Sequence, residues 1–385
     1  MAGAAWCARR GLTKLEVDAA ALFLPVTEAG GLRPFGPANL PVERRFGRDG
    51  GGFGGRRRRN WGFGSRFWGI LHTGVSLPEF EPMIMEVNAR VVIGLDDLGV
   101  VRIRGVDAVR FLQGQLSNDV TRLSASNSLL AGYHNPQGRT IAVLRLVRWD
   151  ADDILAVVPR ELAGVVAAKL AKFVLRAKVK VTDESAGWRV WGMVGVALTA
   201  GVADGAAFVP IGDAPQRWLV VSPREVASTQ GVPGLSDYVI CDRQTWQRLE
   251  VASGEPQVLA STSEEFVAQM LNLDVLNAIA FDKGCYTGQE VIARAHYRGR
   301  VKRRMQRFVS REACQLAPAE SGQLADGRTF KVVLAAQLAD GRCDFLAVAP
   351  MVGAEREEAA PVGVPTVAPT ALLADQVPLP YSLPD

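Results

Sequence analysis

The order of short apolar strands and single helices constrains this chain's fold more than any other feature. "VVIGLDDLGVVRIRG" alternates apolar residues around a turn, which predicts a hairpin or a strand pair. "RTIAVLRLVRW" and "DILAVVP" are typical of strands, "RELAGVVAAKLAKFVLR" of an amphipathic helix, and "KVKVTDES" and "WRVWGMVGV" of strands again. "VDAVRFLQGQLSNDVTRL" has helical spacing, with an apolar stripe of Val106, Val109, Phe111 and Leu112. This order predicts an α+β fold with a mainly antiparallel sheet.

A second cycle follows the first. "RWLVVSP" predicts a strand, "CDRQTWQRLEVASG" a helix ending near Gly254, and "EEFVAQMLNLDVLNAIAF" a helix and a turn. Beyond Arg307, short strands separated by two "ADGR" turns are typical of a small β-barrel or sandwich.

The composition changes along the chain and predicts four regions. Residues 1–85 are Gly/Arg-rich and lack apolar periodicity, so they favour a disordered extension or translated upstream DNA. An RGG-like nucleic-acid segment and a transit peptide are the alternatives for this region. Residues 86–305 are expected to form an α+β region divided near residue 200. Residues 306–350 are expected to form the barrel, and 351–385 an Ala/Pro-rich tail.

Charge and cysteine content exclude several classes of protein. Residues 1–90 hold thirteen Lys/Arg and eight Asp/Glu, so the net charge of +4 leaves about −1 for the rest of the chain, which does not favour general nucleic-acid adhesion. No apolar run is long enough to span a bilayer, and we expect no membrane partner. Five scattered cysteines without metal-ligand spacing predict a reducing compartment, the cytoplasm, and no metal site.

The segment "KGCYTGQEVIARA" contains the strongest candidate for chemistry. Thr287 and Glu290 fit a capping box, with Thr287 as the N-cap of a following helix. Cys285 would then lie close to the positive end of the helix dipole, with Lys283 nearby, and both favour a thiolate. An inert, buried cysteine is the competing interpretation, and capping alone accounts for Glu290.

A basic run follows the cysteine. Residues 283–307 hold eight Lys/Arg and one acid, Glu290. A solvated face is the ordinary explanation, but this density also suits a polyanion such as a polyglutamate tail, a phosphate or RNA. Asn118 and Asp119 in "GQLSNDV" indicate a cap, and "HNPQGR" indicates a turn between strands.

Together these segments resemble the YgfZ-type folate-binding proteins, relatives of the glycine-cleavage aminomethyltransferase that act in iron–sulfur cluster assembly or repair. The resemblance covers roughly Asp96 to Pro350, and "KGCYTGQE" is its most specific motif. It implies GcvT-like tandem α+β domains around a folate cavity, plus a C-terminal β-barrel. Residues 1–85 match nothing in it.

The resemblance also implies roles for individual residues. Cys285 matches the family's signature cysteine, and the rest of its motif includes Lys283, Tyr286, Gln289 and Arg294. Glu250 matches the glutamate that contacts the pterin ring in the aminomethyltransferases. A carboxylate suits this contact because it can accept two hydrogen bonds from the ring. Asp119 matches the aspartate near the reactive end of folate. Basic residues near Arg298 to Arg304 are expected to meet the folate's glutamate tail.

The resulting hypothesis is a tetrahydrofolate-binding accessory protein for iron–sulfur enzymes, with radical tRNA-modifying enzymes as clients and Cys285 as a reactive thiol. The first alternative is an enzyme, a folate-dependent aminomethyltransferase that uses Asp119. The second is a tRNA-binding protein that uses the basic run.

Overall fold

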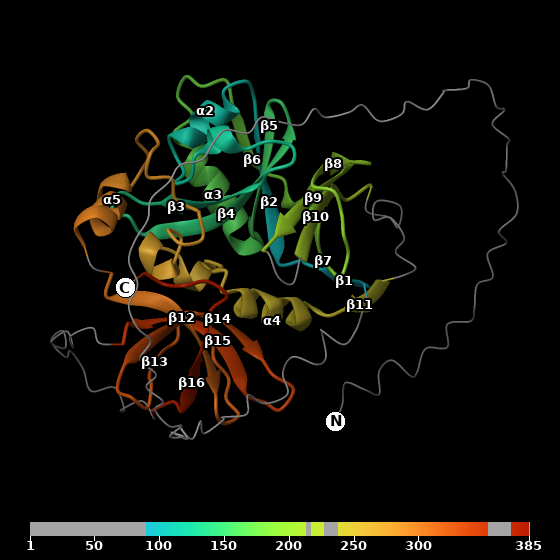
Figure 1. Ribbon diagram of the computed structural model, residues 1–385. Coiled ribbons are helices and arrows are strands. Elements are labelled where there is room, and N and C mark those ends of the chain that lie inside the picture. Colours follow the sequence, from blue (N-terminus) through green and yellow to red (C-terminus); the bar gives the residue numbers. More distant parts are fainter. Residues whose placement is uncertain (1–89, 213–216, 227–237, 300, 353–370, 385) are drawn as a thin grey trace, which may run out of the picture. The chain divides into compact units, whose positions relative to one another are not determined.

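The computed structural model describes residues 90–212, 217–226, 238–299, 301–352 and 371–384, and all of them belong to one compact unit, residues 76–385 (Figure 1). The predictions for residues 1–85 lie outside the described residues. The structure contains three sheets that are almost entirely antiparallel, which confirms the α+β fold class.

Sheet 1 is antiparallel throughout, and its strand order is β3-β4-β5-β2-β6. Its β4 and β5 are the two strands predicted from "RTIAVLRLVRW" and "DILAVVP". The "HNPQGR" segment forms the turn between β3 and β4, where Gly138 has a φ of 71°. The strands are β2 (Leu98–Arg104), β3 (Leu129–His134), β4 (Thr140–Asp150), β5 (Asp153–Pro159) and β6 (Lys180–Asp183).

Sheet 2 has the order β11-β1-β7-β10-β9-β8, and within it β1 and β11 are parallel. Its strands are β1 (Arg90–Gly94), β7 (Trp188–Val194), β8 (Gly201–Ala203), β9 (Ala206–Ile211), β10 (Arg217–Pro223) and β11 (Tyr238–Cys241). Residues 91–105 form two strands around a turn, as predicted, but the hairpin pairing is wrong, because β1 joins sheet 2 while β2 joins sheet 1. Local alternation identifies each strand but carries no information about its partner.

The two sheets pack face to face. Leu98 and Val100 on β2 share a core with Val190 and Leu219 of sheet 2, whereas the alternate β2 residues Val101 and Ile103 face a second core that includes α3 (Arg160–Ala171). Because neighbouring side chains on a strand point to opposite faces, β2 contributes to both cores. Sheet 1 therefore lies between sheet 2 and α3.

Sheet 3 is C-terminal, antiparallel and ordered β13-β14-β15-β12-β16. Its edge strands are linked through one isolated bridge, Leu324 to Leu372, so among the described residues the predicted barrel is an antiparallel sheet without a continuous closing ladder. The two "ADGR" turns hold Gly327 and Gly341 at positive φ. The strands are β12 (Arg303–Ser310), β13 (Ser321–Gln323), β14 (Thr329–Gln337), β15 (Cys343–Pro350) and β16 (Ala374–Val377).

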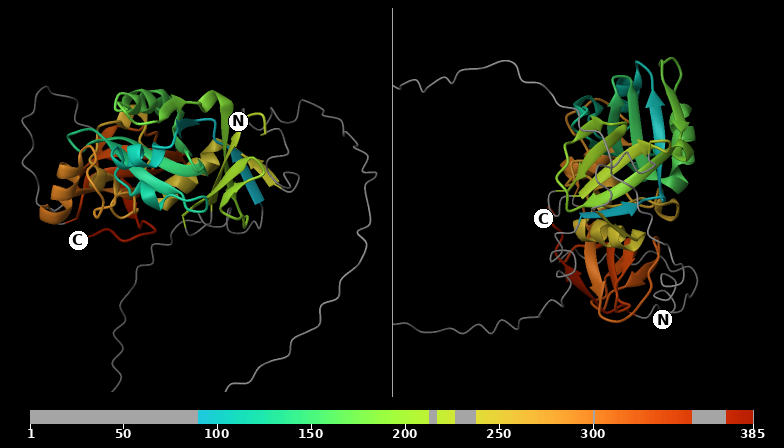
Figure 2. Two further views of the ribbon diagram at one scale, coloured as in Figure 1. Left: turned by 90° about the horizontal axis from the view of Figure 1, so that it is seen from above. Right: turned by 90° about the vertical axis from the view of Figure 1, so that its right-hand side faces the viewer.

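The remaining helices connect these sheets. Helix α4 (Arg243–Ser253) lies between β1 and the sheet 3 strands β14 and β15 (Figure 2). Helix α5 (Gln289–Arg298) lies at one edge of the structure (Figure 1). No helix in the described part of the chain is long and apolar enough to cross a membrane.

Two helix predictions are wrong in extent. The helix predicted from Val106 onward is the six-residue α2 (Ala108–Gln113), and Val106 itself lies outside it and is 66% exposed. In the second predicted helix, residues 264–281 contain only a 3-10 turn, Ala268–Leu271.

Candidate functional site

Helix α4 places Glu250 in the interior. The helix begins after Asp242, whose side chain accepts a hydrogen bond from the Thr245 N–H at 2.9 Å, and ends at Gly254 in the left-handed conformation, as its sequence predicts. One face buries Trp246, Leu249 and Glu250. Sheet 2 approaches this face at Gly192, where an added Cβ would lie 2.4 Å from the Trp246 ring. The fold thus holds the Glu250 carboxyl group away from water.

The carboxyl oxygens of Glu250 have different surroundings. Oε1 accepts hydrogen bonds from Trp246 Nε1 at 2.9 Å and Gln257 Nε2 at 2.6 Å. Oε2 lies 2.9 Å from Arg243 Nη2 as an ion pair, but accepts no hydrogen bond of good geometry. Burial raises the pKa of Glu250 to about 7, against the opposing effect of Arg243. The group therefore has an acceptor oxygen to spare and titrates near neutral pH.

A cavity of about 60 Å³ borders this carboxyl group. Arg217 and Glu255 line it, and Arg217 lies over the Trp246 ring, 5.3 Å from the guanidinium carbon to the ring centroid. Glu255 forms ion pairs with Arg145 and, at 3.7 Å, with Arg217, and these arginines hold the pKa of Glu255 low in spite of burial. Arg217 Nη2 has no hydrogen-bond partner. The cavity wall therefore offers both a buried donor and a buried acceptor.

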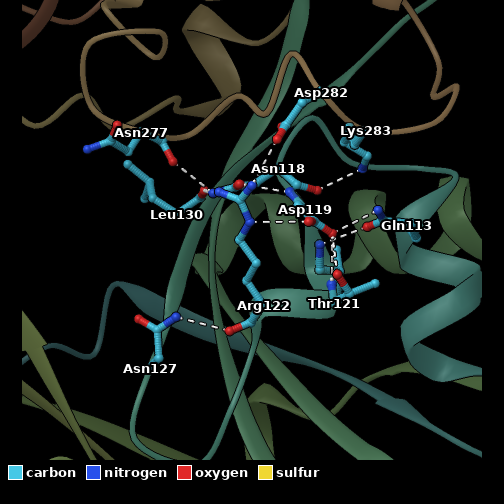
Figure 3. A network of polar contacts seen from close by, with 11 residues as sticks. Gln113, Asn118, Asp119, Thr121, Arg122, Asn127, Leu130, Asn277, Asp282 and Lys283 are labelled. Carbon is cyan, nitrogen blue, oxygen red and sulfur yellow. Dashed lines mark hydrogen bonds and ion pairs between the residues drawn. The ribbon is translucent and has the colours of Figure 1, made fainter.

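Asp119 and Lys283 meet in a second cluster (Figure 3). Lys283 Nζ donates to the carbonyl oxygens of Leu116 and Asn118, each at 2.7 Å. Burial lowers the pKa of Lys283 to about 8, while the nearby Asp119 carboxylate opposes this. Asp119 caps the 3-10 turn Val120–Arg122, and bonds from Thr121 and Gln113 hold the pKa of Asp119 below its usual value. The predicted cap at Asp119 is confirmed.

One residue connects this cluster with the Glu250 cavity. Asn118 Nδ2 donates to the Leu130 carbonyl oxygen at 2.7 Å (Figure 3), and Leu130 also lines the cavity. Hydrogen bonds through Asn118 thus link Lys283 to the cavity wall at Leu130.

Cys285 lies on the loop that leaves this cluster. Cys285 is exposed to solvent, and its thiol forms no disulfide. The adjacent Tyr286 is buried, with Lys283 Nζ 5.2 Å from its ring centroid and the His134 ring 6.5 Å away. Tyr286 therefore anchors a loop that presents Cys285 to solvent, and the buried-cysteine interpretation is wrong.

The capping box predicted at Thr287 and Glu290 is also wrong. Helix α5 begins at Gln289 with Gly288 as its N-cap, and no side chain caps it. Gly288 has a φ of 81°, and a Cβ there would lie 2.5 Å from the Asn135 carbonyl oxygen. The β3–β4 turn thus approaches the helix start too closely for a side chain. Cys285 lies four residues before the first residue of α5.

The basic run divides into two groups. Lys283, Arg304 and Arg307 bond to groups inside the fold, and Arg304 and Arg307 form close ion pairs with Asp274 and Asp344. Arg303 donates to Thr329 at the surface. The exposed Arg294 and Arg298 on α5 have no hydrogen bond or ion pair within the described residues. Gln289, at the start of the same helix, is half-buried. The folate-tail role predicted for Arg298 stays a prediction, as does the folate-binding role that the motif implies for Arg294.

Sequence reasoning missed most of the residues around Glu250. Arg145, Arg217, Glu255 and Gln257 come from β4, β10 and the segment after α4, and no local motif joins them. The signals available were charged residues within the predicted strands "RTIAVLRLVRW" and "RWLVVSP". Across the described residues, no group of three or more His, Cys, Asp or Glu side chains is placed to hold a metal ion.

Comparison with known proteins supports the fold. No protein-family profile matches the chain. The structure is similar to aminomethyltransferase T of the glycine cleavage system from Bartonella henselae, with a TM-score of 0.56 and 13% identity over 68% of this chain and 78% of that one. A heterotetrameric sarcosine oxidase from Corynebacterium sp. U-96 also matches, at 13% identity over 37% of this chain and 80% of that one. Its TM-score of 0.26 is too low to indicate a shared fold. The chain therefore has a GcvT-like fold.

Proposed function

We propose that this protein binds a reduced folate at the Glu250 cavity. The observation that carries the proposal is the buried Glu250 carboxyl group, whose Oε2 accepts no hydrogen bond, beside Arg217 Nη2, which donates none. Buried polar atoms without a hydrogen bond are costly and uncommon in native proteins, so they favour a ligand that supplies one. The GcvT-like fold, which this chain shares with a glycine-cleavage aminomethyltransferase, agrees with the folate cavity that the sequence resemblance implies.

The chemistry of the cavity fits the edge of a pterin ring. A pterin has neighbouring amino and ring N–H donors for a carboxylate, and a ring oxygen that can accept from a guanidinium. The space of about 60 Å³ is below the several hundred Å³ usual for small-molecule sites, so the ligand must enlarge it on entry. Gln257, which donates to Glu250 Oε1, is the group that the pterin would displace.

A titration with folinic acid, a stable reduced folate, tests this site. Glu250→Gln replaces an acceptor oxygen with a donor at constant shape, and we expect at least a tenfold loss of affinity, as for a hydrogen bond to a charged group. Glu184→Gln is the matched control, because Glu184 also pairs with an arginine, Arg102, but outside the cavity. Equal affinity of the wild type and the Glu250→Gln variant would refute the site.

Beyond folate binding, we propose that the protein supports iron–sulfur enzymes, including radical tRNA-modifying enzymes, through Cys285. Its favourable features are an exposed, free thiol and a loop anchored by Tyr286 and Lys283. One thiol cannot supply the four thiolates of a typical cluster, so a client must provide the remaining ligands.

Cys285→Ser separates this role from folate binding. We expect unchanged affinity for folinic acid and loss of the protein's ability to restore activity to a cluster-depleted client enzyme. Cys241→Ser, at a half-buried cysteine, is the control. Full restoration by the Cys285→Ser protein would eliminate the thiol from the mechanism.

Asp119 favours a second candidate, folate-dependent aminomethyl transfer. Its lowered pKa keeps the carboxylate charged, as required to hold a cationic amine, and Asn118 links it to the cavity wall. Methylene transfer to tetrahydrofolate by the wild type, abolished in Asp119→Asn, would establish this reaction. An absence of turnover would leave the accessory role.

A further inference from the structure

An exposed apolar cluster surrounded by cations lies just beyond the end of α3. Leu175 is 87% exposed, Val106 66% and Phe173 51%. Between Lys172 and Thr182 the sequence contains no acid and four cations. We call these seven residues the α3-end patch: Val106, Lys172, Phe173, Leu175, Arg176, Lys178 and Lys180.

The backbone beneath the patch is firmly held. Val174, Ala177 and Val179, which alternate with patch residues, pack against the core. The Lys178 N–H donates to Asp107 Oδ2 at 2.6 Å, and the Asp107 N–H donates to the Lys178 carbonyl oxygen at 3.4 Å. These contacts fix the patch side chains in an outward orientation.

Val106 is attached to the same surface by a close backbone approach. Gly105 has a φ of 139°, and a Cβ at this position would lie 2.1 Å from the Lys178 carbonyl oxygen. Only glycine permits this contact, which places Val106 beside the segment from Lys172 to Lys180.

The cations of the patch are free to meet a partner. Their side chains make no hydrogen bond or ion pair with any residue that the structure describes. The adjacent acid, Asp107, already accepts from the Lys178 backbone. The patch therefore combines exposed apolar groups with a net positive charge.

Against the sequence expectation of no membrane partner, we propose that the α3-end patch docks the protein on an anionic lipid surface. Aliphatic and aromatic side chains can enter the headgroup boundary while flanking lysines and arginines meet lipid phosphates, a combination typical of peripheral membrane binding. The inference is independent of the folate site.

Other occupants fit these residues less well. A second copy of the patch would bring like charges together. Single-stranded RNA stacks on aromatic rings, but Val106 and Leu175 are aliphatic. An amphipathic peptide needs a groove, and no patch residue lines the Glu250 cavity or the cavity of about 520 Å³ beside Phe266 and Phe330.

Vesicle flotation of the full chain tests the proposal. The probes are phosphatidylcholine vesicles with and without phosphatidylglycerol, at low and physiological salt. We expect binding only to the anionic vesicles, and weaker binding at the higher salt concentration. Phe173→Ser with Leu175→Ser should abolish most of the binding. Lys172→Gln with Arg176→Gln should lower the partition coefficient by roughly fivefold for each charge removed.

Two control variants match these changes. Ile240→Ser removes an aliphatic residue that is 80% exposed on β11, and Arg224→Gln removes an exposed cation outside the patch. Both should bind vesicles like the wild type. All substituted side chains are exposed, so unchanged melting temperatures are expected. Failure to bind anionic vesicles would overturn the proposal, as would binding that survives both pairs of patch substitutions, since another surface would then be responsible.

Discussion

Glu250 is expected to make the protein less stable as the pH rises. Burial raises its pKa to about 7, compared with an ordinary value of 4.5. Between these two values the folded state holds a proton that the unfolded state has released, so the free energy of unfolding falls as the pH increases. The difference in pKa corresponds to roughly 3 kcal/mol, reached in full above about pH 7.

Glu250→Gln removes this titration. Glutamine keeps an acceptor for Trp246 and Gln257 and carries no charge at any pH, while Arg243 retains its second partner, Asp97. The free energy of unfolding of the variant, minus that of the wild type, should grow by about 2–3 kcal/mol between about pH 5 and about pH 8. The variant is thus expected to gain relative stability at the pH where it has lost folate affinity.

Urea unfolding of both proteins across this pH range measures the difference, because all other titrating groups cancel. Glu184→Gln is the control. Burial opposes ionisation of Glu184, but Arg102 holds its pKa below the usual value, so its contribution is already complete at about pH 5 and its difference should stay flat. A flat or falling difference for Glu250→Gln would show that the carboxyl group is ionised in the folded protein throughout, and would refute the reasoning.

The remaining predictions concern the Cys285 loop and α5. Gly288→Ala should destabilise the protein by about 1–3 kcal/mol because of its positive φ and the Asn135 contact, whereas Gly284→Ala, with open space around it, should leave the melting temperature unchanged. Ile292→Ala should cost about 2–5 kcal/mol and increase hydrogen exchange in α5, where Ile292 is the buried residue, while the exposed Val291→Ala should do neither. Lys283→Met should cost about 1–3 kcal/mol by leaving two carbonyl oxygens without their donor, and Lys302→Met, which breaks no described bond, should be neutral in urea unfolding.

Helix ends were predictable where short-range chemistry decides them. Helix α4 has its N-cap at Asp242 and its C-terminal glycine at 254, and both signals are within the sequence of the helix itself. At α5 the same kind of signal fails, because the β3–β4 turn, about 150 residues earlier in the chain, contacts Gly288. The capping pattern of Thr287 and Glu290 contains no information about that distant contact.

The candidate site divides along the same line. The segment holding Lys283, Cys285 and Tyr286 is continuous, so a motif can reveal it. The Glu250 cavity depends on Arg145 and Arg217, which reach it from strands of two different sheets. Strand pairing across such separations is set by packing of the whole core, and a single sequence does not specify it locally.

Charge counting along the chain also overstates the anion-binding capacity of residues 283–307. An arginine that is paired in the interior cannot meet an outside anion without leaving its carboxylate unpaired. The side chain of Arg304 is 4% exposed beside Asp274, and that of Arg307 is 16% exposed beside Asp344. If either arginine turned to bind a ligand, its aspartate would be left as an unpaired buried charge, which is strongly destabilising. Of the described basic side chains in the run, Arg294, Arg298 and Lys302 make no hydrogen bond or ion pair with described residues. A polyglutamate tail that uses this region must therefore gain its affinity from the outer face of α5 and the residues directly after it, and affinity for longer tails should fall with Arg294→Gln and Arg298→Gln but not with Arg303→Gln.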